Sequence, residues 1–149
     1  MDKMLGGYQA LQIRLLNGRI FQKLLNKEPD AQYRSEQGKI LTILWKQELG
    51  CATATDIALA TGLANNTLTS MVKKLEEQGL VTIQPCTQDK RKKYISLTEL
   101  GWEQKEIGDR VSKELGEIFY QGFSDQEIRE FEAYQARIIT NLKKKENEE

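Results

Sequence analysis

The feature of this 149-residue sequence that most limits its fold is a pair of short helical patterns followed directly by two short strand patterns. The first helical pattern begins at Thr53 with a T-x-x-D start, a weaker relative of the capping box, and stops at Gly62. In the second, the apolar residues of 68–75 recur at i, i+3, i+4 and i+7, and Gly79 follows as a terminating glycine. Two short helices joined by a tight turn that contains glycine predict a helix-turn-helix.

The two strand patterns extend this helix-turn-helix to a winged helix. Residues 80–83 and 94–97 alternate in character, as paired strands do. The loop between them, residues 84–93, is polar and ends in a dense basic run. We therefore expect a recognition helix at 65–78 and, directly after it, a basic wing at 84–93.

Long helices are expected on both sides of this region. Apolar stripes predict a first helix over Met4–Asn26 and a second at about 36–47, with Ser35 as its N-cap. Thr98 can cap a long helix, 98–121, and Ser124 opens the last helix with a capping box. The expected fold class is therefore mainly α with a small β-wing.

The composition narrows the possible functions. The chain has no histidine, which removes the most common general base and the usual histidine-bearing zinc sites, so we expect no enzyme, no metal site and no cofactor. The carboxylates Glu103 and Glu106 could serve a small hydrolase, but one helical turn apart on a charged surface they are expected to be solvated. No stretch approaches the roughly 18 apolar residues that span a membrane, and no signal peptide is evident, so we expect a cytoplasmic protein.

The two cysteines, Cys51 and Cys86, are too few for a disulfide framework. Cys51 is expected in the loop before the helix-turn-helix, and Cys86 in the wing, where the basic run could activate its thiol. Whether either thiol is redox-active or both are incidental stays open at this point.

Charge is unevenly distributed although the formal net charge of the chain is zero. Residues 65–97 contain six basic residues against three acidic ones. The six basic residues are Lys73, Lys74, Lys90, Arg91, Lys92 and Lys93. A basic run between the two strands of a winged helix is typical of phosphate contact, and it predicts binding to double-stranded DNA.

The first half of the recognition helix carries small side chains that form hydrogen bonds: Asn65, Asn66, Thr67, Thr69 and Ser70. Such side chains fit the major groove, where asparagine can bind adenine with two hydrogen bonds and a threonine methyl group can contact thymine. One of the two asparagines is expected to cap the helix, because the preceding Ala64 has no capping group. The other side chains are expected to contact DNA.

Residues 35–101 resemble the MarR family of winged-helix transcription regulators. The matching pieces are, in order, Thr53-x-x-Asp56-Ile57-Ala58, Gly62-Leu63, Thr67-Leu68-Thr69, Lys74-Leu75-Glu76-x-x-Gly79-Leu80-Val81, Asp89-x-Arg91 and Leu97-Thr98-x-x-Gly101. No single piece is specific, but the ordered set is, above all the D-x-R wing followed by L-T-x-x-G. The long flanking helices also fit, so the resemblance covers nearly the whole chain.

The resemblance implies a homodimer. A single MarR-like domain would comprise an N-terminal dimerisation helix (1–34), a winged-helix DNA-binding lobe (35–98) and C-terminal dimerisation helices (99–149). Two recognition helices would then lie roughly 34 Å apart, one DNA turn, on a pseudo-palindromic operator. The resemblance also implies that Arg91 reaches the minor groove from the wing tip, and that Asp89 holds this arginine or its loop.

Members of the family often respond to a small, frequently aromatic or anionic molecule bound between the DNA-binding lobe and the dimerisation helices. The chain would then be a ligand-responsive repressor, with Trp45 and Trp102 either lining an effector cleft or packing in the core. A second interpretation is a winged-helix module that binds protein without specific DNA contact, which the neutral net charge favours. A steep loss of binding as salt rises would distinguish a DNA partner from a protein partner.

Overall fold

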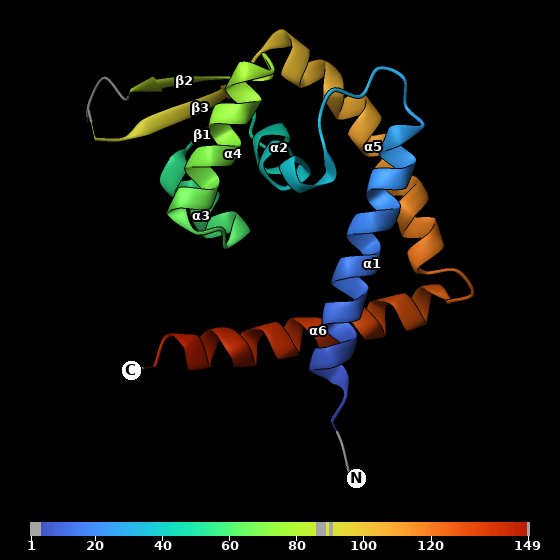
Figure 1. Ribbon diagram of the computed structural model, residues 1–149. Coiled ribbons are helices and arrows are strands. Elements are labelled where there is room, and N and C mark those ends of the chain that lie inside the picture. Colours follow the sequence, from blue (N-terminus) through green and yellow to red (C-terminus); the bar gives the residue numbers. More distant parts are fainter. Residues whose placement is uncertain (1–3, 86–88, 90, 149) are drawn as a thin grey trace. The chain divides into compact units, whose positions relative to one another are not determined.

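The computed structural model describes residues 4–85, 89 and 91–148. Its elements follow in the order α1 (Gly6–Asn26), the 3-10 helix η1 (Ser35–Gln37), α2 (Gly38–Trp45), β1 (Cys51–Thr53), α3 (Ala54–Thr61), α4 (Asn65–Glu77), β2 (Val81–Pro85), β3 (Lys93–Leu97), α5 (Glu99–Phe119) and α6 (Asp125–Glu146). The chain forms two compact units, Met1–Leu115 and Gly116–Glu149. None of the described helices is long and apolar enough to cross a membrane. The helices and the small sheet confirm the expected fold class (Figure 1).

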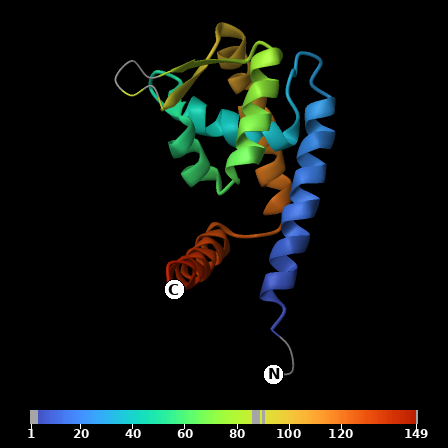
Figure 2. The same ribbon diagram turned by 60° about the vertical axis from the view of Figure 1, so that its left-hand side comes forward.

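One apolar core holds the first unit together, and its buried residues come from each of the α-helices α1–α5 and from the strands β2 and β3. The helix α2 is its centre, because Ile40, Leu41 and Leu44 are completely buried. Figure 2 shows α2 enclosed by the other helices of this unit. The remaining core residues are Leu24, Leu25, Tyr33, Ile57, Leu68, Val72, Leu75, Leu80, Val81, Ile95, Ile107, Val111 and Leu115.

The helix-turn-helix forms as its capping residues predict. Thr53 Oγ1 accepts the Asp56 N–H at 3.1 Å and opens α3. Gly62, at φ 74°, closes α3 in a left-handed conformation that glycine adopts without steric cost. Gly79, at φ 80°, plays the same role after α4 and directs the chain into β2.

The sheet has three antiparallel strands in the order β1-β3-β2. The two expected strands pair as a hairpin, with Val81 opposite Leu97 and Pro85 opposite Lys93. The third strand, β1, was not predicted, because three residues are too short to show an alternating pattern. Its first residue is Cys51, which therefore lies in a strand opposite Ser96 and not in the expected loop.

The prediction of a second helix at 36–47 is wrong at both ends. The α-helix is only Gly38–Trp45, and η1 precedes it. Ser35 is not an N-cap but the first residue of η1, and its N–H donates to Gln22 Oε1 at 2.8 Å. The backbone closes here with 3-10 hydrogen bonds, in which the Gln37 N–H donates to the Arg34 carbonyl oxygen at 2.9 Å, and Gln37 Oε1 in turn accepts the Arg34 N–H at 2.8 Å.

The helix α5 begins at a close contact with the end of α4. Thr98 Oγ1 donates to the Gly79 carbonyl oxygen at 2.6 Å and accepts the Gly101 N–H at 3.1 Å. The Thr98 N–H donates to the Leu80 carbonyl oxygen at 3.1 Å. A Cβ atom at Gly101 would overlap that same carbonyl oxygen, so glycine is required here. The L-T-x-x-G sequence therefore joins the recognition helix, the hairpin and α5.

The second unit consists of the end of α5 and the helix α6. Ser124 opens α6 with the expected capping box, in which Ser124 Oγ accepts the Glu127 N–H at 3.1 Å. An aromatic cluster packs at the turn between the helices, formed by Phe119, Tyr120, Phe123 and Phe131. None of the residues of α6, all of which are described, is buried.

We expect Gly101→Ala to lower the free energy of unfolding by about 1–3 kcal/mol, because the new methyl group overpacks the contact with Leu80. Gly116→Ala is the matched control on the same helix. Apart from its chain neighbours and its own helix backbone, no described atom lies within 4 Å of a Cβ at Gly116, and alanine should stabilise the helix by up to about 1 kcal/mol. Urea unfolding followed by circular dichroism measures both variants. Equal effects of the two substitutions would contradict the role given to Gly101.

Candidate nucleic-acid interface and ligand pocket

The polar face of α4 is exposed from the first turn of the helix to the last. The side chains expected to contact DNA on this helix are all exposed: Asn65, Asn66, Thr67, Thr69, Ser70, Lys73 and Lys74. The opposite face anchors the helix in the core through Leu68, Val72 and Leu75. Because buried residues fix one face, the other presents its polar groups in a defined direction over about 20 Å.

Local hydrogen bonds decide which groups on α4 remain free. The N-cap is Ala64, which makes no side-chain capping bond, so the expectation of an asparagine N-cap is wrong. Asn66 Oδ1 instead accepts the Thr67 N–H at 2.8 Å from within the first turn. Thr69 Oγ1 donates to the Asn65 carbonyl oxygen at 2.8 Å, so this hydroxyl is already paired within the helix. The methyl group is the part of threonine that contacts thymine.

In the wing, Asp89 binds Arg91 through both its backbone and its side chain. Asp89 Oδ1 accepts the Arg91 N–H at 3.0 Å and the Arg91 Nε–H at 3.2 Å. The hydrogen bond from the Arg91 side chain is the main reason why the pKa of Asp89 is lowered. The Arg91 side chain nevertheless remains 91% exposed. Asp89 thus orients the guanidinium group without removing it from solvent.

Two further lysines of the expected basic run follow the Asp89–Arg91 pair in the chain. Lys92 and Lys93 are exposed, and Lys93 is the first residue of β3. Lys90 and Cys86 lie outside the described residues. The other cysteine, Cys51, is a partly buried free thiol.

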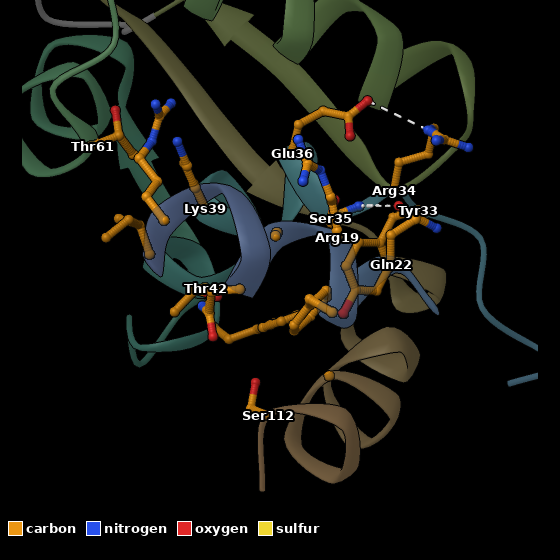
Figure 3. Close-up of a pocket in the computed structure, with 18 of the residues that line it drawn as sticks. Arg19, Gln22, Tyr33, Arg34, Ser35, Glu36, Lys39, Thr42, Thr61 and Ser112 are labelled. Atoms are coloured by element: carbon orange, nitrogen blue, oxygen red, sulfur yellow. Dashed lines mark hydrogen bonds and ion pairs between the residues drawn. The ribbon is translucent and has the colours of Figure 1, made fainter. Parts of the chain in front are cut away.

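The first unit also contains an open pocket of about 810 Å³ lined by α1, residues 33–36, α2, the end of α3 and α5 (Figure 3). Its apolar walls include Leu15, Phe21, Ile43 and Trp45. The charged residues that line it are Arg14, Arg19, Arg34, Lys39 and Glu36. The single carboxylate, Glu36, pairs with Arg34 at 3.5 Å, so the pocket as a whole is positive.

The hydroxyl group of Tyr33 has no partner in this pocket. Tyr33 is buried, and its Oη forms no hydrogen bond with any described residue. Its ring packs edge-on against Trp45, with the centroids 5.9 Å apart. Burial, followed by the charge of Asp109, raises the pKa of Tyr33 to about 12, so the hydroxyl is a neutral donor at pH 7. A buried hydroxyl without a partner costs about 1–3 kcal/mol, which a polar ligand atom would offset.

The two tryptophans have different environments. Trp45 lines the pocket and donates its Nε1–H to the Gly101 carbonyl oxygen at 3.0 Å. Trp102 does not line the pocket; it packs against Gly50 and remains 36% exposed. The carboxylates considered for a hydrolase are both exposed on α5, and Glu106 pairs with Arg110 at 3.4 Å.

Sequence reasoning missed most of the pocket. Tyr33 stands in a polar stretch between the first two helices, where no periodic pattern marks a residue as buried. The cations Arg14 and Arg19 belong to α1, whose apolar stripe predicts the helix but does not indicate that its charged side chains line a pocket. Gly108, in the middle of a long predicted helix, is the one sequence feature that could have indicated this packing. A Cβ atom there would lie 3.0 Å from Tyr33 Oη and 2.9 Å from the Trp45 ring. A glycine in the middle of a long helix often marks such a close approach.

Comparisons with known proteins agree with this geometry. The model of the MarR family matches residues 34–93. The fold resembles that of AbsC, a MarR family transcriptional regulator from Streptomyces coelicolor, with a TM-score of 0.82, 20% identity and coverage of 96% of both chains. It also resembles MepR of S. aureus in complex with DNA, with a TM-score of 0.83, 22% identity and coverage of 93% of this chain and 99% of that one.

A third similar structure is Bordetella bronchiseptica BpsR, whose DNA binding is regulated by 6-hydroxynicotinic acid. Its TM-score is 0.72 at 19% identity, with coverage of 99% of this chain and 96% of that one. No curated protein matches the sequence significantly. The family model covers the helix-turn-helix, β2 and the first residue of β3, and the solved structures extend the same fold over the rest of the hairpin and the flanking helices. Residues 34–93 therefore match the MarR family, and the chain as a whole has the same fold as these solved structures.

Proposed function

We propose that the chain is a cytoplasmic regulator of transcription that binds a pseudo-palindromic DNA operator as a homodimer and represses the promoter it occupies. The recognition helix α4 enters the major groove with Asn65, Asn66, Thr67, Thr69, Ser70, Lys73 and Lys74. The wing contacts the adjacent minor groove through Arg91, and Lys90, Lys92 and Lys93 bind phosphates. Asp89 holds the wing arginine in position.

One observation carries this proposal: an exposed polar helix face and an exposed basic hairpin belong to the same compact unit. A helix anchored by its apolar face and polar on the other is suited to insertion into the major groove, which is about 12 Å wide. The charge near the wing supplies the phosphate attraction that the neutral chain as a whole lacks. The DNA complex of the similarly folded MepR supports the same use of this fold.

Unpartnered apolar faces on the terminal helices support the homodimer. The exposed large apolar residues are Leu5, directly before α1, then Tyr8, Leu11, Ile13, Leu15 and Leu16 on α1, and Tyr134, Ile138, Ile139 and Leu142 on α6. A monomer rarely exposes so many large apolar side chains on two helices. A second copy of the chain would cover them, which gives residues 1–34 and 99–149 the role of dimerisation helices.

We expect Arg91→Ala to weaken binding to every DNA sequence and to reduce the salt slope of the binding constant by about two units, because the homodimer loses two phosphate-proximal cations, one from each subunit. Lys105→Ala is the matched control. It removes a cation of α5 that pairs with Asp109 at 2.8 Å, and it should leave both quantities unchanged. Fluorescence anisotropy with labelled duplex DNA at several salt concentrations measures them. Unchanged affinity of Arg91→Ala at low salt would contradict the assigned role of the wing.

The pocket is proposed to hold a small effector that lowers affinity for DNA. Its cations outnumber its one carboxylate, its walls carry Phe21 and Trp45, and Tyr33 supplies a free donor, so the effector is a planar molecule with an anionic group. The regulation of BpsR by 6-hydroxynicotinic acid supports a ligand of this chemical class. The effector acts by favouring a conformation in which the two recognition helices no longer match successive major grooves.

We expect Tyr33→Phe to weaken the binding of an aromatic acid about fivefold, because one hydrogen bond to the ligand is lost. The same substitution removes an unpaired buried hydroxyl and should not lower the free energy of unfolding. Tyr94→Phe, on the exposed surface of β3, is the matched control and should change neither quantity. Quenching of tryptophan fluorescence by benzoate, nicotinate and 6-hydroxynicotinate, measured in a Trp102→Phe background so that only Trp45 emits, provides the measurement. If none of the three binds the native protein, the proposed class of effector is wrong.

A further inference from the structure

A chain of glutamine side chains connects the recognition helix to the wall of the pocket. The connection runs through the segment Asp30–Gln37, which we call the pocket segment because it supplies Tyr33, Arg34, Ser35 and Glu36 to the pocket. This segment lies between α1 and α2 and contains only the 3-10 helix η1 as regular structure. Its position is therefore set mainly by side chains that bind its backbone.

The link to α4 consists of three hydrogen bonds in sequence. Gln37 Oε1 accepts the Arg34 N–H at 2.8 Å, and Gln37 Nε2 donates to Gln78 Oε1 at 2.7 Å. Gln78 Nε2 then donates to the Gln32 carbonyl oxygen at 3.2 Å. The backbone groups at the two ends fix the orientation of both amides, because an N–H can only donate and a carbonyl can only accept.

Gln78 is the C-cap residue of α4, so this link ends on the recognition helix itself. The other side of the pocket segment is attached to α5. There the Gln32 N–H donates to Gln104 Oε1 at 2.8 Å, and Gln104 Nε2 donates to the Asp30 carbonyl oxygen at 3.2 Å. We call the side chains of Gln37, Gln78 and Gln104 the glutamine clamp.

Burial protects two of the three residues of this clamp. Gln37 is 3% exposed and Gln104 is 2% exposed, so water cannot readily replace their partners, whereas Gln78 is partly exposed and depends on its bond to the buried Gln37 amide. A buried amide that loses its partner is left unsatisfied, which penalises any movement that breaks a single bond. The pocket segment and the end of α4 must therefore move together or exchange the whole set of hydrogen bonds.

We propose that the glutamine clamp couples the pocket to the recognition helix, with Gln37 and Gln78 as positioning residues that transmit displacement of the pocket segment to α4. The coupling rests on the proposed function, in which the pocket holds an effector and α4 binds DNA. It adds the physical route between them. A ligand that contacts Tyr33 displaces the pocket segment, and the hydrogen bonds of the clamp transmit this displacement to Gln78 at the end of α4. Because linkage is reciprocal, DNA bound at α4 must act back on the pocket.

The test compares Gln78→Met with Gln47→Met in the full-length chain. Gln78→Met keeps the side-chain length but removes both amide bonds of the clamp. Gln47→Met makes the same chemical change at an exposed glutamine just after α2, whose side chain donates to the Ile43 carbonyl oxygen at 3.2 Å and takes no part in the clamp. Amide hydrogen exchange followed by NMR reports on the free protein, and it does not require that DNA or effector binds.

In the free protein, Gln78→Met should accelerate exchange of the Gln32 and Ser35 amides about fivefold or more, although neither amide bonds to Gln78. Gln104→Met should accelerate exchange at Gly79 and Leu80, at the far end of the clamp, by a similar factor. Gln47→Met should change none of these rates. Effects confined to amides next to each substitution would overturn the coupling, whatever the protein binds.

A second measurement connects the clamp to regulation. With 6-hydroxynicotinate as the probe, native protein and Gln47→Met should lose DNA affinity about fivefold or more on probe binding. Gln78→Met should still bind the probe, as Trp45 fluorescence reports, but its DNA affinity should change less than about twofold. An undiminished effect of the probe in Gln78→Met would overturn the proposal. Failure of the native protein to bind probe or DNA would instead refute the proposed function, and hydrogen exchange alone would then decide on the clamp.

Discussion

The orientation of α4 and of the basic wing depends on one close contact, where the residues after α4 meet the start of α5. Thr98 bonds to the Gly79 carbonyl oxygen and the Leu80 carbonyl oxygen, and Gly101 lacks the side chain that would separate them. The recognition helix ends at this contact and the hairpin begins there. A shift of Gly101 relative to Leu80 would therefore reorient the polar face of α4 and the basic wing together.

The same contact also reaches the pocket. The carbonyl group of Gly101 accepts the Nε1–H of Trp45, whose ring lines the pocket and packs against Tyr33. Recognition helix and pocket are thus connected on two sides of the unit, through Gly101 and Trp45 on one side and through the glutamine clamp on the other. Two discrete connections of this kind suit a protein in which occupancy of one site alters the other.

The sequence was sufficient for those parts of the structure whose signals are local. Caps such as Thr53 and Ser124, terminating glycines such as Gly62 and Gly79, and helical spacing from Leu68 to Leu75 each act within a few residues. These features predicted the helix-turn-helix, the hairpin and the exposed polar face of the recognition helix. The assignment of that face to DNA remains a prediction.

The pocket could not be found in the same way, because it forms from segments that are distant in the sequence. Tyr33 is buried by packing against Trp45 and the backbone of Gly108, which no local pattern records. The sequence likewise does not predict that Gln37 and Gln104 are buried, because glutamine is usually an exposed residue. At the start of α4 a local rule was misleading. It predicted an asparagine N-cap, but the N-cap is Ala64, and Asn66 accepts the Thr67 N–H from inside the first turn.

The most direct test of the central claim, that this chain reads DNA as a dimer, is selection from random duplex DNA. The purified protein is mixed with a random-sequence pool at several salt concentrations, and the bound DNA is recovered and sequenced. We expect an enriched pseudo-palindrome whose half-sites lie about one helical turn apart, with binding that falls steeply as salt rises. A pool without enrichment, bound weakly at every salt concentration, would contradict the claim and favour a protein partner for this winged helix.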